Sequence, residues 1–144
     1  MSLKSAFDTS PKIQLWNNLF WQNTAASQGN DVYFDDDEDG NFVLTPIRLN
    51  NNAYDMAAGL FIRVPETPLG GGNVNATDPQ FLSPAQGDYR LLGTSPMIDM
   101  GSALAPALGT VDATGMPRIS GAAPDIGAFE YNADIIFRSG FELP

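Results

Sequence analysis

The chain has 144 residues, which is enough for one domain with a sizeable core. Its formal net charge is −10 with only seven Lys and Arg, so its surface repels nucleic-acid phosphates and anionic lipid. Histidine and cysteine are absent, which excludes disulfides, Ser-His-Asp or Cys-His catalysis, and metal sites built on these side chains. Because of this net charge we expect no nucleic-acid partner. No apolar run approaches the roughly 18 residues of a membrane helix, so we expect no membrane insertion.

A short pattern near the N-terminus occurs twice. Residues 13–20 read Ile-Gln-Leu-Trp-Asn-Asn-Leu-Phe, and residues 47–54 repeat the pattern Ile-x-Leu-x-Asn-Asn-x-aromatic 34 residues later. The alternating Ile and Leu predict a strand, and the Asn pair, which tolerates left-handed backbone, predicts a corner after it. We therefore predict stacked, parallel coils in which Asn18 lies near Asn52. Two unrelated strands with Asn turns are the alternative.

Further strands are predicted from short apolar runs between turn-forming residues. We expect residues 1–12 to be a lead-in or a cloning scar, and residues 21–30, 65–75 and 84–87 to be loops and turns. The further expected strands are 31–34, 57–64, 89–92, 125–131 and 135–137. Because Gly and Pro are frequent and no helix longer than two turns is expected, the fold class is all-β.

An acidic turn separates the two copies of the repeat. Asp35, Asp37 and Asp39 precede a glycine and match the first half of a calcium loop, in which alternate carboxylates converge on one hard cation. The twelfth position of such a loop holds Pro46 instead of a bidentate Glu, which excludes a complete EF-hand. The turn is therefore either a weak Ca²⁺ site at these three aspartates or a solvated acidic turn.

A long pattern of specific residues fills the C-terminal half. Its first part is Asn75, Asp78-Pro79, Phe81, Pro84, Gly87-Asp88-Tyr89-Arg90-Leu91, Ser95-Pro96, Ile98-Asp99 and Gly101. Its second part is Asp112, Gly115, Pro117-Arg118, Gly121 and Asp125-Ile126-Gly127-Ala128-Phe129-Glu130. Over residues 73–131 this pattern resembles the C-terminal end of bacterial right-handed parallel β-helix repeat proteins, the pectin-lyase-like class. Thr94 and Phe129 are minor departures from it.

The resemblance implies a fold and a class of function. The fold is a short right-handed parallel β-helix segment over 13–75 with an irregular C-terminal cap over 76–131, followed by a terminal strand and tail over 132–144. The implied location is secreted or on the outer cell surface. We expect a non-enzymatic, adhesin-like structural module that caps such a protein. The alternative is the non-catalytic end of a polysaccharide lyase or hydrolase, with polysaccharide as the partner.

We expect mainly structural roles for the charged and aromatic residues, and we assign no catalytic residue. Arg118 suits a bidentate carboxylate partner, and we expect that partner to be one of Asp99, Asp125 and Glu130. A carboxylate pair for glycoside hydrolysis is the alternative. The other candidates are Arg48 and Arg63, expected to face outward, and Trp16, Phe20, Trp21 and Tyr54, expected either to stack between coils or to bind sugar faces.

The predicted first coil has an exposed edge. If it begins the stack, Ile13, Leu15 and Leu19 face water, which is unfavourable for apolar area. We expect a homodimer that joins two such coils about a two-fold axis. The alternative is a lid formed by residues 4–11, with Phe7 over the core.

Overall fold

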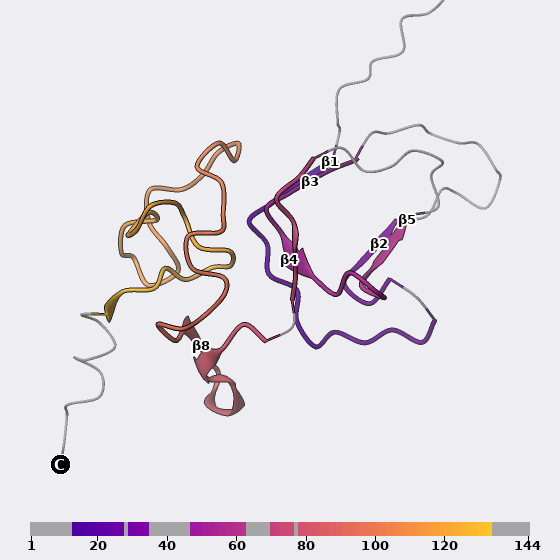
Figure 1. Cartoon of the computed structure of the whole chain (residues 1–144), viewed down its shortest axis with the longest axis horizontal. Coiled ribbons are helices and arrows are strands. Elements are labelled where there is room, and N and C mark those ends of the chain that lie inside the picture. Colours follow the sequence, from indigo (N-terminus) through magenta and orange to yellow (C-terminus); the bar gives the residue numbers. More distant parts are fainter. Residues whose placement is uncertain (1–12, 28, 35–46, 63–69, 77, 134–144) are drawn as a thin grey trace, which may run out of the picture.

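The computed structural model describes residues 13–27, 29–34, 47–62, 70–76 and 78–133 (Figure 1). Short strands and irregular segments make up nearly all of this part of the chain, which confirms the all-β class. The strands are β1 (Ile13–Trp16), β2 (Val32–Phe34), β3 (Ile47–Asn50), β4 (Ala53–Tyr54), β5 (Leu60–Ile62), β6 (Val74–Asn75), β7 (Phe81–Ser83) and β8 (Asp88–Leu91). In the described ranges no helix is long and apolar enough to cross a membrane.

Six strands form three parallel pairs. β1 pairs with β3, with Ile13 opposite Ile47 and Leu15 opposite Leu49, which confirms the pairing predicted from the repeat. β2 pairs with β5, and β4 pairs with β6, also in parallel. In Figure 1 these pairs lie on three sides of a ring, with β1 and β3 on one side, β4 on the second, and β2 and β5 on the third. We call β1 and β2 the first layer, β3, β4 and β5 the second layer, and β6 the third layer.

Each layer turns a corner at a residue with left-handed backbone, and an asparagine follows it. The corner residues are Asn17 with φ 56°, Asn51 with φ 51° and Gly72 with φ 72°. The amide of Asn18 donates to Asn52 Oδ1 over 3.0 Å, and the amide of Asn52 donates to Asn73 Oδ1 over 3.2 Å. The prediction that Asn18 lies near Asn52 is confirmed, and Asn73 is a third rung of the same ladder.

Two predictions, one of a loop and one of a strand, are corrected in this half of the chain. Residues 65–75 were expected to be a loop, but Val74 and Asn75 form β6 because they pair with β4 of the layer before. The strand expected over 57–64 begins later than predicted, at Leu60 of β5, because a turn occupies residues 56–59 and Gly59 N–H donates to Asp55 O over 2.7 Å. The last two residues of that prediction, 63 and 64, lie outside the described residues.

The C-terminal segment, residues 78–133, begins with a hairpin and continues as irregular chain. β7 and β8 pair antiparallel around η1 (Pro84–Gln86), a 3₁₀ turn at the position where a turn was predicted. The strand predicted over 125–131 is wrong. Gly127 has φ 118°, and the Tyr131 N–H donates to the Asp125 carboxylate over 2.6 Å instead of to a neighbouring strand.

A cluster of buried apolar residues lies between the layers and the C-terminal segment. Ala53 of β4 packs with Leu91, Met97 and Ile126, and all four are at most 2% exposed. Figure 1 shows the orange and yellow part of the chain beside β4. The segment expected to cap the coils therefore packs along the side of the layers, in contact with more than one of them.

Close approach of the C-terminal segment depends on Gly101. A Cβ at this position would lie 2.6 Å from Pro124 O and 3.2 Å from Asn17 Cγ. Gly101→Ala should therefore lower the free energy of unfolding by about 1–3 kcal/mol, the usual cost of overpacking. Gly71→Ala is the matched control, because its Cβ would meet nothing within 4 Å. Equal urea midpoints for the two variants would contradict this packing.

Candidate functional site

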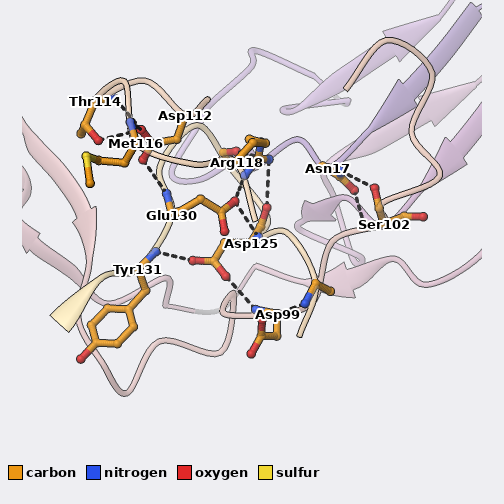
Figure 2. Close-up of polar contacts among 12 residues, drawn as sticks. Asn17, Asp99, Ser102, Asp112, Thr114, Met116, Arg118, Asp125, Glu130 and Tyr131 are labelled. Atoms are coloured by element: carbon orange, nitrogen blue, oxygen red, sulfur yellow. Dashed lines mark hydrogen bonds and ion pairs between the residues drawn. The ribbon is translucent and has the colours of Figure 1, made fainter. Parts of the chain in front are cut away.

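Arg118 lies at the centre of a buried polar network in the C-terminal segment (Figure 2). The residue is 9% exposed, and its Nη1 pairs with Glu130 Oε1. Its Nη2 donates to the carbonyl oxygens of Asp125 over 3.1 Å and Gly127 over 3.0 Å. The guanidinium thus ties a carboxylate and two backbone carbonyls together, and the prediction that Arg118 is buried against Asp99, Asp125 or Glu130 is confirmed for Glu130.

The buried carboxylates of this network bind backbone N–H groups. Asp125 accepts from Asp99 N over 2.8 Å and from Tyr131 N over 2.6 Å. Asp112 accepts from Met116 N and Glu130 N, each over 3.0 Å. An irregular chain lacks a strand partner for these donors, and a buried donor without an acceptor is costly. The geometry therefore supports the expected structural role for Asp125 and Glu130.

The network continues into the corner of the first layer. Asn17 accepts from Ser102 N over 2.8 Å and donates back to Ser102 O over 3.0 Å, a reciprocal pair visible in Figure 2. Gly127 N donates to Asn17 O over 2.9 Å. In the second layer, Asn51 Nδ2 donates to Met100 O over 3.0 Å. Corner residues of two layers are thus fixed to the C-terminal segment.

The charge state of Asp125 should make stability depend on pH. Burial raises the pKa of the Asp125 carboxyl above its ordinary value of 3.8, despite its two backbone hydrogen bonds. A raised carboxyl pKa stabilises the fold below the unfolded-state pKa, and this contribution is lost as the pH rises through the folded-state pKa. The stability advantage over Asp125→Asn should therefore shrink as the pH rises from the ordinary aspartate pKa of 3.8 through the folded-state pKa. Urea denaturation across this range measures it.

Asp88 provides a control, because the expected pH dependence of its contribution to stability has the opposite sign. The side-chain hydrogen bond from Arg90 lowers the pKa of Asp88 below 3.8, so its contribution is present above that pH and is lost on acidification. The wild-type advantage over Asp88→Asn should be small, because the pair is about a quarter exposed, and it should fall toward low pH. A wild-type advantage over Asp125→Asn that does not change with pH would contradict the assignment.

A pocket of about 700 Å³ lies between the first layer and the C-terminal segment. Its aromatic lining consists of Trp16, Phe20, Trp21, Phe81, Tyr89 and Phe129. Trp21 and Tyr89 each pack edge-on against Phe81, with centroid distances of 5.2 and 5.3 Å. The polar residues of its lining are Asn17, Asn18, Asn23 and Arg118. An open pocket with aromatic walls and a few polar groups has the usual character of a binding site.

Sequence reasoning identified only part of this pocket. Three of the four aromatic candidates line it, whereas Tyr54 does not. The C-terminal contributions, Phe81, Tyr89 and Phe129, belong to the long pattern of the C-terminal half but gave no signal of proximity to the first layer. The sequence distance between these segments explains why the pocket was not predicted.

The predicted calcium loop lies outside the described residues, as do Asp35, Asp37 and Asp39 themselves. Weak Ca²⁺ binding there stays a prediction. Within the described ranges no three acidic side chains cluster as metal ligands. Arg63 and Phe7 also lie outside these ranges, while Arg48 is half-buried on β3, opposite Gln14.

No protein-family model, no curated protein and no solved structure matches the chain.

Proposed function

We propose that this chain is a non-enzymatic structural module that ends a secreted or surface protein of the right-handed parallel β-helix type. The observation that carries the proposal is the asparagine ladder of Asn18, Asn52 and Asn73 on three parallel layers. Such a ladder requires coils that stack in fixed register, because each amide must meet the amide of the next coil. The resemblance of residues 73–131 to β-helix C-termini supports the same assignment.

The C-terminal segment fits a supporting role in such a module. Its buried Arg118, Asp125 and Glu130 are engaged with one another and with backbone groups. Asn17 and Asn51 join it to successive layers. These contacts bind neighbouring layers to one common element, which would oppose their separation at the end of a longer stack.

A second candidate is the non-catalytic end of a carbohydrate-active enzyme, and the aromatic pocket favours it. Sugar rings pack on aromatic faces, and Asn18, which lines the pocket, would supply a hydrogen bond. The chain has two tryptophans, Trp16 and Trp21, and both line the pocket. Tryptophan fluorescence therefore reports on this site and on β1, which carries Trp16. A saturable change on titration with neutral or acidic oligosaccharides would support this candidate against the structural module.

Adding one coil tests the structural proposal. A second copy of residues 13–46 is inserted directly before Ile13, so that it can pair with β1 in the register of the repeat. Stacked repeats gain stability from each neighbour, so the melting temperature should rise. The control carries Ser in the inserted copies of Ile13 and Leu15 and should show no rise. An insertion that leaves the melting temperature unchanged would contradict the proposal.

A further inference from the structure

The first layer exposes residues whose equivalents in the second layer are buried. Ile13 is 36% exposed, whereas Ile47, its partner in the repeat, is 5% exposed. Leu15 is half-buried, whereas Leu49 is 3% exposed. The two layers carry the same sequence pattern. The difference in exposure arises because β1 covers one edge of β3, whereas no strand among the described residues covers the outer edge of β1.

Within the described residues, the ladder has an acceptor without a donor at the same edge. Asn52 Oδ1 accepts from the backbone N–H and the side-chain amide of Asn18, over 2.9 and 3.0 Å. Asn73 Oδ1 accepts from the same two groups of Asn52, over 3.0 and 3.2 Å. Asn18 Oδ1 accepts no hydrogen bond from the described residues. The pattern therefore leaves one position for an asparagine that would donate two hydrogen bonds to Asn18.

The donor side of the ladder shows the same interruption. Asn52 Nδ2 donates to Leu15 O, a carbonyl of the layer before it, over 2.9 Å. Asn18 Nδ2 donates instead to Trp16 O of its own strand, over 3.0 Å. Asn18 thus makes a local hydrogen bond where its equivalent in the next layer reaches across to a neighbouring strand.

The aromatic pocket lies beside this position. Leu19 follows the ladder residue of the first layer and lines the pocket. Its equivalent in the second layer, Ala53, is completely buried against Leu91 and Ile126. The C-terminal segment thus packs tightly on the residue after the asparagine in the second layer, and leaves an open pocket with apolar walls at the level of the first.

We infer that the β1 edge and the aromatic pocket together bind an extended polypeptide segment that runs parallel to β1. Its sequence pattern is that of the repeat: two apolar residues in alternation, then an asparagine, then an apolar residue. The asparagine donates its backbone N–H and its amide to Asn18 Oδ1, and the apolar side chain after it enters the pocket. This inference rests on the proposed stacking, and it names the kind of segment that the stack accepts beside β1.

Charge and direction distinguish this partner from a second copy of the chain. Each copy carries a net charge of −10, which opposes close association of two copies. A two-fold axis would also set the two β1 strands antiparallel, and the ladder requires parallel strands. A neutral or basic segment in parallel direction meets both requirements.

A peptide with the sequence of residues 47–54, with blocked ends, is a suitable probe. It carries the repeat pattern and no tryptophan, so Trp16 and Trp21 of the chain report binding by fluorescence. A saturable change is expected. The control peptide has alanine in place of the residue equivalent to Asn52, which keeps the backbone N–H but removes the side-chain amide, and the loss of that hydrogen bond to Asn18 should weaken its binding about fivefold.

Every outcome bears on the inference. Tighter binding of the asparagine peptide supports it. If neither peptide binds, or if both bind equally, the inference is overturned. It is also overturned if light scattering detects a dimer of the chain and the peptide does not dissociate that dimer. A response to a neutral oligosaccharide that displaces the peptide would assign the pocket to sugar instead. If the inserted coil raises the melting temperature but the peptide fails, the structural function stands and this inference alone is wrong.

Discussion

Arg118→Ala should lower the free energy of unfolding by about 3–5 kcal/mol, because it leaves the Glu130 carboxylate buried without its cation. The Glu130 side chain is 1% exposed, and its Oε2 has no hydrogen-bond partner in the described part of the chain. The variant also frees the carbonyl oxygens of Asp125 and Gly127. For a chain of this size the melting temperature should fall by about 10 °C or more.

Arg90→Ala is the matched control for this prediction. Arg90 pairs with Asp88 over 2.6 Å, but the two side chains are 24% and 26% exposed. An exposed pair of this kind contributes at most about 1 kcal/mol. Calorimetry on both variants should therefore give a large decrease for Arg118→Ala and a small one for Arg90→Ala.

A double variant separates the loss of contacts from the unpaired charge. Glu130→Gln removes the charge and keeps an oxygen that can accept from Asp125 N. Added to Arg118→Ala, it should recover part of the lost stability, since the penalty of a buried, uncompensated carboxylate disappears. A double variant no more stable than Arg118→Ala would show that lost packing, and not the buried charge, dominates.

The repeat predicted the stacking because its signal is local and periodic. Alternation of Ile and Leu sets which side chains turn inward, and the fixed interval of 34 residues sets the register of β1 against β3. The third rung was missed for two reasons. Asn73 follows Asn52 by only 21 residues, and Gly72 takes the left-handed corner that Asn17 and Asn51 occupy in the other layers.

The C-terminal segment was less predictable because its order depends on contacts distant in sequence. The alternation over residues 125–131 has the period of a strand, yet Asp125 and Glu130 turn inward to bind N–H groups of the chain and Arg118. The pattern of the C-terminal half indicated these residues as structural anchors. It carried no information on which layer they would meet, and the pocket depends on that placement.

Asn52→Ala should lower the free energy of unfolding by about 3 kcal/mol, since a buried group that loses its partner costs about 1–3 kcal/mol. Asn52 is 1% exposed and contributes both a donor and an acceptor to the ladder. Its removal leaves the backbone N–H of Asn18 and the carbonyl of Leu15 without their partners, whose distances are both 2.9 Å.

Asn52→Asp and Asn23→Ala make the test specific to the ladder. The aspartate keeps the shape and still accepts from Asn18, but it would turn a carboxylate oxygen toward the oxygens of Leu15 and Asn73, so it should destabilise at least as much as alanine. Asn23 makes one exposed hydrogen bond to Asp31, and Asn23→Ala should change the free energy of unfolding by no more than about 0.5 kcal/mol. A tolerated aspartate would contradict the ladder, because a carboxylate cannot donate along it. Urea denaturation of the three variants at neutral pH therefore tests whether stacked amides hold the layers together.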